Sequence, residues 1–236
     1  MTDLVKKEIS SRNRSLLALG LLVPAPTIGV LSAMIWWPDS TLGSGIFAVC
    51  KLWLLLLPVV WLVAVDKQRP SLSIPRKGGF LFGLTTGIGI SVIIAIAYGL
   101  FGSELIDPTF FKQKMSEIGL DNRQRYIWGA VYWITINSVI EEYVWRWFVV
   151  SKCEDLLKQN MAVTFSALFF TLHHVVALSV YLGAMAVVLC SLGVFIGGLT
   201  WSYTYSKYRS IWPCYLSHAI VDLCIFLIGA SLLFET

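Results

Sequence analysis

Apolar residues occur along the chain in long uninterrupted runs, and most charged residues lie in the short stretches between them. A helix needs about 20 apolar residues to cross the hydrocarbon core of a bilayer. The pattern therefore predicts an all-α membrane protein with about seven spans, at 15–37, 44–65, 78–102, 126–149, 161–181, 182–203 and 210–233. Only Tyr181 to Gly183 marks a turn between the fifth and sixth, so six spans with one re-entrant segment remain open.

Proline and glycine predict local features within these spans. Pro24 and Pro26 are expected to kink the first helix, because proline lacks the amide hydrogen that helical bonding requires. Three glycines in the third span favour close packing against a neighbouring helix. They are Gly83, Gly87 and Gly89.

Composition excludes a soluble domain. The 236 residues are 57% hydrophobic and only 14% charged, whereas soluble domains carry about 25% charged residues. The net charge of +4 is too small to indicate nucleic-acid binding, and no signal peptide is evident at the N-terminus. The five cysteines form no CxxC pair, so we expect neither a disulfide framework nor a cysteine zinc site. The chain is predicted to be one membrane domain, 1–236, with its chemistry in 126–226.

Basic residues predict the orientation, because lysine and arginine are enriched in cytoplasmic loops. A cytoplasmic N-terminus places 12 basic residues inside and 4 outside. Inside are Lys6, Lys7, Arg12, Arg14, Lys67, Arg69, Arg76, Lys77, Lys152, Lys158, Lys207 and Arg209; outside are Lys112, Lys114, Arg123 and Arg125. The longest loop, 103–125, mixes charged and large apolar residues and is predicted to contain a helix at the membrane surface.

Ionisable side chains inside the apolar runs are the candidates for function, because a charge at membrane depth is costly. The chain places all three of its histidines there. The set comprises Lys51, Glu141, Glu142, Arg146, His173, His174, His218 and Asp222. Lys51 stands alone in its run, and we expect it to snorkel or to pair, without a catalytic role.

Helical spacing separates the two adjacent glutamates. Glu142 and Arg146 are four residues apart and are predicted to pair on one helix face. Glu141 points about 100° away and shares its face with Asn137. One carboxylate could therefore be held by the arginine while the other stays free to react. A purely structural clamp between helices is the alternative.

The histidines lie on two other spans. His173 and His174 are adjacent within "SALFFTLHH", and His174 is four residues after Phe170. His218 and Asp222 are also four residues apart, and a carboxylate at that spacing can orient an imidazole ring. Each arrangement alone also fits a buried structural residue. Together they predict three helices whose polar groups converge on one cavity that holds water.

Three motifs in the second half of the chain resemble those of the CPBP family, the CAAX proteases and bacteriocin-processing enzymes. "EEYVWR" matches EExxxR, "SALFFTLHH" matches FxxxH, and "SHAIVD" is similar to HxxxN. The FxxxH motif fits Phe170 with His174 best, although Phe169 with His173 has the same spacing. The match covers roughly residues 126–226, and the first 125 residues carry no motif.

The resemblance implies an intramembrane endopeptidase of the glutamate type, in which water is the nucleophile. In such a protein Glu141 and His174 would activate the water, and Glu142 with Arg146 would position the first carboxylate. His218 and the residue at position 222 would stabilise the oxyanion. Asp222 departs from the usual asparagine, so it is either protonated or acts by orienting His218.

Metal dependence stays open at this stage. Two histidines and a glutamate form a known catalytic zinc set, which would consist of Glu141, His174 and His218. The chain has no HExxH motif, and we expect catalysis without a cofactor.

The resemblance further implies a partner within the lipid bilayer: a lipidated or membrane-anchored substrate of the CAAX, leader-peptide or sorting-signal type. The compact chain suggests a prokaryotic cell membrane. Two other functions remain open: an inactive bacteriocin-immunity or scaffold member of the same fold, and a proton-coupled transporter, because intramembrane Glu, His and Asp also form proton relays.

Overall fold

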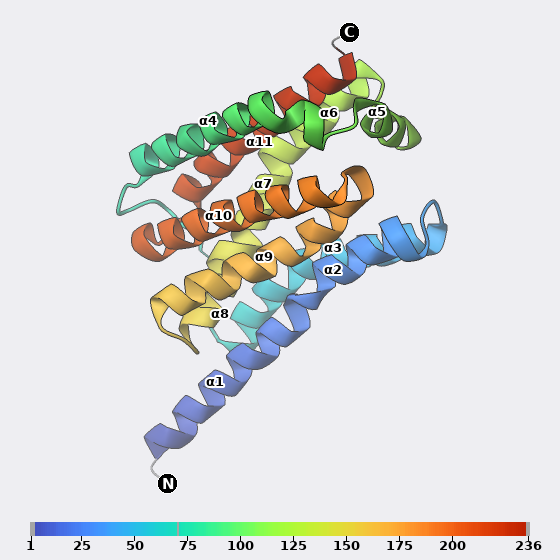
Figure 1. Cartoon of the computed structure of the whole chain (residues 1–236). Helices are drawn as coiled ribbons and strands as arrows, with labels where there is room; N and C mark the ends of the chain where they lie inside the picture. Colours follow the sequence, from blue (N-terminus) through green and yellow to red (C-terminus); the bar gives the residue numbers. More distant parts are fainter. Residues whose placement is uncertain (1–2, 70, 235–236) are drawn as a thin grey trace.

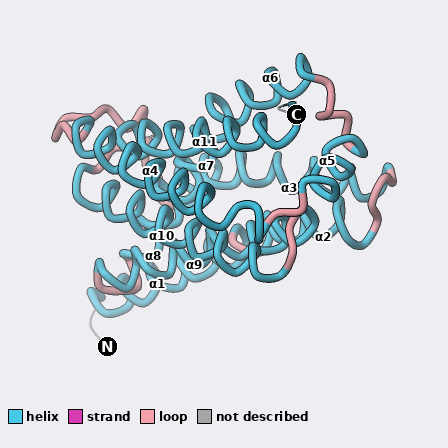
Figure 2. Tube along the Cα trace, turned by 45° about the horizontal axis from the view of Figure 1, so that its top comes forward, coloured by secondary structure: helices cyan, strands magenta, loops and turns pink. Residues whose placement is uncertain are grey.

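The computed structural model describes residues 3–69 and 71–234, and it leaves the side chains of residues 3–8 and 10 undescribed. Within this part of the chain every regular element is helical, as the sequence predicts, and no strand occurs. Figure 2 shows these helices joined by loops, of which the one between Val65 and Phe80 is long. Lys6 and Lys7, which contribute to the predicted charge asymmetry, lie outside the described side chains.

Six helices in the described residues are long and apolar enough to cross a membrane. The first two combine several segments: α1 (Asp3–Leu22), α2 (Pro24–Leu31) and the π-helical turn η1 (Ser32–Trp36), then α3 (Thr41–Val60) and η2 (Trp61–Val65). The other four are α4 (Phe80–Leu105), α9 (Gln159–Tyr181), α10 (Ala184–Tyr208) and α11 (Ile211–Phe234). The chain is an integral membrane protein with several spans.

The predicted span at 126–149 differs from these six. It lies within a helical run of five segments: α6 (Arg123–Tyr132), η3 (Trp133–Asn137), α7 (Ser138–Glu142), η4 (Tyr143–Val150) and α8 (Ser151–Glu154). Glu141, Glu142 and Arg146 give the middle of this run three charged residues, so it does not count among the six apolar helices. The predicted number of seven spans is therefore not confirmed.

Two predicted breaks in the helices are confirmed. Helix α9 ends at Tyr181 and α10 begins at Ala184, so the turn at Leu182 and Gly183 separates two spans. The first helix is interrupted at Val23, and Pro24 opens α2. Proline suits this first-turn position because its missing amide hydrogen would have no helical partner there.

The glycines of α4 allow close contact with α11. A Cβ atom at Gly83 would lie 2.2 Å from the carbonyl oxygen of Pro213, and one at Gly87 would lie 3.0 Å from the Cα of Ser217. The predicted close packing is thus confirmed at these two positions. Gly89 has no such neighbour within 4 Å. Figure 1 shows α4 and α11 side by side at one edge of the bundle.

The long loop contains the expected helix, α5 (Pro108–Glu117). The side chain of Asp107 caps it by accepting hydrogen bonds from the amides of Thr109 and Phe110. Its placement at the membrane surface stays a prediction.

Charged residues that were predicted on the same side of the membrane do meet. Lys152 pairs with Asp66 at 2.6 Å, and Arg209 pairs with Glu154. Arg14 donates a hydrogen bond to the carbonyl of Val65. These contacts join α1, the end of η2, α8 and the end of α10 at one end of the bundle, which agrees with the grouping of loops on which the orientation rests.

The core is built around η4. Its residues Val144, Trp145 and Phe148 to Val150 are almost fully buried, and they pack against Phe170 of α9 and Trp201 of α10. In Figure 1 the helical run from α6 to α8, which contains α7, passes behind α9 and α10. The charged part of this helical run therefore lies in its enclosed half, so its polar side chains must find partners on the helices around it.

Candidate active site

The polar residues picked out by sequence do converge. Glu141 and Glu142 lie on α7, Arg146 on η4, the His173–His174 pair on α9, and His218 and Asp222 on α11. His218 has carboxylate oxygens of three residues within 4 Å of its ring nitrogens, namely Glu141, Glu142 and Asp222. The convergence expected from three separate motifs is thus present in the fold.

The helix carrying the glutamates is widened on both sides of them. The π-helical segments η3 and η4 flank the five-residue α7. Ser138 follows this wider pitch, because its hydroxyl lies 2.9 Å from the carbonyl oxygen of Trp133, five residues earlier. Short π-helical segments occur frequently at functional sites because they redirect side chains. Here they set the directions in which Glu141 and Glu142 leave the helix.

Glu142 is completely buried and accepts two hydrogen bonds. Its Oε2 atom accepts from Nε of Arg146 at 3.1 Å, which confirms the predicted pairing across one helical turn. Its Oε1 atom accepts from Nδ1 of His218 at 2.8 Å. A buried carboxylate is tolerable only when such partners replace water, and Glu142 therefore has the environment of a fixed anion.

Arg146 is equally enclosed, with no exposed surface. Its two terminal nitrogens make no hydrogen bond to any described residue. The guanidinium carbon instead lies 4.6 Å from the ring centre of Phe170 and 5.4 Å from that of Trp201. The negative faces of these rings attract the cation and compensate part of the lost hydration.

His218 is oriented from two directions. Its Nδ1 atom meets Glu142, and its ring stacks on Trp201 with the ring centres 3.9 Å apart. Because a carboxylate can only accept, Nδ1 carries a hydrogen. The other nitrogen, Nε2, lies 3.7 Å from Glu141 and 3.6 Å from Asp222. This nitrogen is the part of the ring that faces the reactive side of the site.

Asp222 lies close to His218 but makes no hydrogen bond to it in the described structure. The distance of 3.6 Å between them is too long for a hydrogen bond, and Oδ2 of Asp222 accepts instead from the hydroxyl of Ser138 at 2.6 Å. Glu142 makes the hydrogen bond that fixes the ring. Helical spacing brings these two side chains within ion-pair distance but does not set the angle between their polar atoms, so the orienting role of Asp222 stays a prediction.

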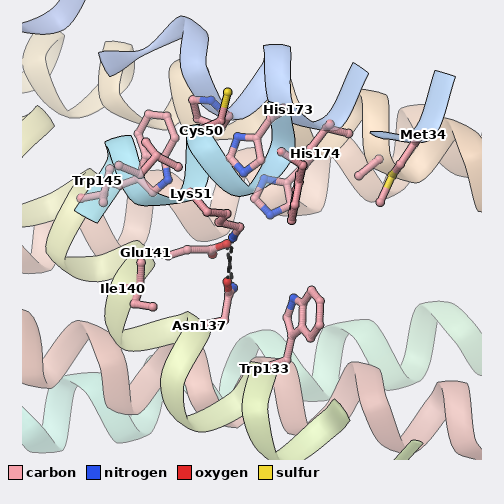
Figure 3. Close-up of a pocket in the computed structure, with 17 residues that line it drawn as sticks. Met34, Cys50, Lys51, Trp133, Asn137, Ile140, Glu141, Trp145, His173 and His174 are labelled. Carbon is pink, nitrogen blue, oxygen red and sulfur yellow. Dashed lines mark hydrogen bonds between the residues drawn. The ribbon is translucent and has the colours of Figure 1, made fainter. Parts of the chain in front are cut away.

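Glu141 has a different environment from Glu142. Its side chain is partly buried, and its Oε1 atom accepts from Nδ2 of Asn137 at 2.9 Å, which confirms the predicted shared face. Lys51 of α3 donates to Oδ1 of the same asparagine at 3.1 Å. Figure 3 shows Lys51, Asn137 and Glu141 meeting below the two histidines.

The histidines of α9 lie on the same cavity. Nδ1 of His174 is 2.8 Å from the carbonyl oxygen of Phe170, so it donates there, and a neutral ring then keeps its lone pair on Nε2. His173 stacks on Trp145, with ring centres 5.5 Å apart, and its Nδ1 has no partner among the described residues. Of the two, His174 has the geometry that fixes a defined proton acceptor.

A cavity of about 150 Å³ lies against these groups. Its polar side is formed by Lys51, Asn137, Glu141, His173 and His174, which Figure 3 shows together. The rest of its wall is largely apolar and comes from α2, η1, α3, η3, α7, η4 and α9. Other lining residues are Pro26, Gly29, Val30, Met34, Phe47, Cys50, Leu54, Trp133, Ile140, Val144, Trp145 and Ala177. Glu142, Arg146 and His218 do not line it.

The structure changes the metal-ligand set that the sequence suggested. Glu141, His173 and His174 each offer a ligand atom, and these atoms lie within 4.8 Å of one another. Histidine and glutamate are residue types that bind zinc, and two histidines with one glutamate form a known ligand set. His218 is not in this set, although its Nε2 lies 3.7 Å from Glu141; its Nδ1 is hydrogen-bonded to Glu142.

Sequence reasoning missed the contribution of three residues. Lys51 was given no role in the site, although a lone lysine in an apolar run was a visible signal. Ser138 contacts Asp222, and Trp201 stacks on His218. A serine and a tryptophan are common in apolar helices, so no signal in the sequence distinguished these two.

The comparisons with known proteins agree with this geometry. Residues 123–224 match the family model described as "Type II CAAX prenyl endopeptidase Rce1-like". The matched range begins with α6 and contains all three motifs and all six predicted site residues. No curated protein and no solved structure matches the chain. Residues 123–224 are therefore similar to the Rce1-like family of CAAX proteases, in agreement with the resemblance of the three motifs.

Proposed function

We propose that this protein is an intramembrane endopeptidase that hydrolyses a peptide bond of a membrane-anchored or lipidated substrate, using a water molecule activated by Glu141 and His174. One observation carries the proposal. A carboxylate oxygen of Glu141 and a ring nitrogen of His174 lie within 4.8 Å of each other on the cavity wall. No hydrogen bond joins them in the described structure, and one water molecule can bridge such a distance.

Glu141 would act as the general base, and His174 would hold the same water molecule. A water held between Glu141 and Nε2 of His174 would lose a proton as its oxygen attacks the scissile carbonyl carbon. The carbonyl bond opens to a tetrahedral oxyanion, and the proton passes to the leaving amine as the carbon–nitrogen bond breaks. No acyl-enzyme forms, because water is the nucleophile.

His218 is the best-placed donor to the oxyanion. Since Nδ1 donates to Glu142, Nε2 can donate only when the ring is protonated. The three acidic groups of the site are faced by two cationic side chains, Lys51 and Arg146, so a protonated His218 brings the formal charge of the cluster to zero. Glu142, which Arg146 holds through its other oxygen, then keeps this imidazolium in place. Asp222 contributes negative charge and a contact to Ser138.

A zinc ion remains the alternative to metal-free catalysis. Glu141, His173 and His174 would hold it, and it would supply a more acidic bound water and polarise the carbonyl. We favour the metal-free route because Glu141 already has a hydrogen-bonded position, set by Asn137, from which it can act as a base.

The family points to the substrate class. An Rce1-like endopeptidase implies a prenylated membrane protein as substrate, and the apolar wall of the cavity is compatible with a lipidated or membrane-embedded chain. The basic residues favour a cytoplasmic N-terminus, and the compact chain favours a prokaryotic cell. In that orientation the loops at the α1–α8 end of the bundle would face the cytoplasm.

The test compares the wild type with Glu141→Ala, both purified in detergent. Each is incubated with a farnesylated peptide that ends in a CAAX sequence and with membrane-anchored leader peptides, with and without a chelator. Cleavage by the wild type that is lost in the variant and unaffected by the chelator supports the proposal. Loss with the chelator and recovery with zinc would assign Glu141, His173 and His174 to a metal. A folded wild type that cleaves none of the peptides would favour the inactive immunity or scaffold protein.

A further inference from the structure

Lys51 occupies an unusual position for a lysine. It lies in the middle of α3, an otherwise apolar helix outside the range that matches the family model. Its ammonium group does not reach an aqueous end of the bundle but lines the cavity, and it is the one cationic side chain among the described lining residues. Nζ donates to Oδ1 of Asn137 at 3.1 Å and lies 5.7 Å from the ring centre of Phe47.

The lysine fixes which way the asparagine amide faces. The oxygen and nitrogen of an amide are nearly the same shape, so the orientation follows from the partners. An ammonium group only donates, so Oδ1 of Asn137 must face Lys51. Nδ2 is then turned toward Glu141, whose Oε1 atom accepts from it at 2.9 Å. If the amide turned over, its NH2 group would meet the ammonium and its oxygen would meet the carboxylate.

We infer that Lys51 and Asn137 form a positioning pair for Glu141: Lys51 orients the amide, and the amide occupies one carboxylate oxygen so that the other is presented to water. This inference rests on the proposed function of Glu141 as general base. Oε2 is the oxygen that lies 3.7 Å from Nε2 of His218, on the side where the oxyanion donor stands. Lys51 makes no hydrogen bond to Glu141 in the described structure, so its hydrogen-bonded route to the carboxylate passes through Asn137, while its positive charge also attracts Glu141 directly across the cavity.

A double-mutant cycle tests this chain of contacts, with Lys51→Met, Asn137→Leu and the double variant assayed on the farnesylated CAAX peptide. We expect each single change to lower kcat by about 10- to 100-fold with little change in KM, because the base is misplaced while the substrate contacts persist. The double variant should lose clearly less kcat than the product of the two single losses, because the part of the Lys51 effect that passes through the amide is already lost in Asn137→Leu. Lys51→Arg should recover most of the activity, since a guanidinium can still donate to Oδ1.

Two controls separate positioning from stability and from substrate binding. Lys112→Met removes an exposed lysine from α5 and should leave kcat and KM unchanged. Melting in detergent checks that the variants fold, and Lys51→Gln replaces Lys51→Met if the latter does not. Glutamine keeps a polar group but is too short to make the same contact.

The remaining outcomes overturn the inference in distinguishable ways. If the fold-loss in kcat of the double variant equals the product of the two single fold-losses, Lys51 acts independently of Asn137. A raised KM with unchanged kcat in Lys51→Met would make Lys51 a substrate contact. Unchanged kcat and KM in Lys51→Met would show that Lys51 has no role in the reaction. A wild type as inactive as Glu141→Ala would overturn the proposed function itself and this inference with it.

Discussion

Glu141 and Glu142 are neighbours on one helix, yet their surroundings differ in almost every respect. Glu142 has no exposed surface and is held by Arg146 and His218. Glu141 lines a cavity and is held through one oxygen by Asn137. The difference shows how a single turn of about 100° can assign two identical side chains to different tasks, because each one meets a different set of helices. The fixed carboxylate orders the site, and the other remains available for chemistry.

The largest effect is expected from Glu141→Gln. The change keeps the size of the side chain and its contact with Asn137 but removes the base, so we expect kcat to fall by about 10³-fold or more. The midpoint of thermal unfolding in detergent should not fall, because a partly buried charge is removed without leaving a partner unpaired. Peptide cleavage and melting measured on the same preparation check both parts. Residual activity within tenfold of the wild type would remove Glu141 from the base role.

Glu142→Gln is the matched change at the carboxylate that has no exposed surface. Neutralising this carboxylate leaves Arg146 buried without its counter-ion, and breaking a buried pair in this way costs about 3–5 kcal/mol. We expect a clear drop in the unfolding midpoint together with reduced activity. If Glu142→Gln melted like the wild type while Glu141→Gln did not, the two assignments would have to be exchanged.

The two histidines of α9, which line the cavity with Glu141, are expected to differ in their contribution to kcat. His174→Ala should lower kcat by about 10²-fold or more, because its Nε2 lone pair is held toward the cavity. His173→Ala should cost about tenfold or less, since its ring mainly stacks on Trp145. Both variants are assayed on the farnesylated peptide. The opposite ranking would move the motif register to Phe169 and His173.

The smallest effect is expected from Asp222→Asn. The asparagine oxygen can still accept from Ser138, and its amide can approach Nε2 of His218, so we expect activity within about tenfold of the wild type. Steady-state kinetics and melting are the measurements. A loss as large as that of His174→Ala would show that the carboxylate itself is needed, which would support the role that helical spacing suggested for it.

Much of the fold was predictable because a membrane constrains it strongly. Backbone groups in lipid must be satisfied within the chain, so long apolar runs form helices. The breaks at Pro24 and at Leu182–Gly183 follow from local chemistry in the same way. The span count was less certain, because the run holding Glu141, Glu142 and Arg146 is helical but not apolar enough to count among the six.

The sequence by itself identified the ionisable residues that converge and two of the side-chain pairs within one helix. Glu142 with Arg146 and Glu141 with Asn137 follow from a spacing of four residues. Only the tertiary structure decided which groups meet across helices: His218 with Glu142, Lys51 with Asn137, and His173 together with His174 and Glu141. The physical reason is that helix periodicity fixes neighbours along one helix, whereas packing sets the rotation and depth of each helix against the others.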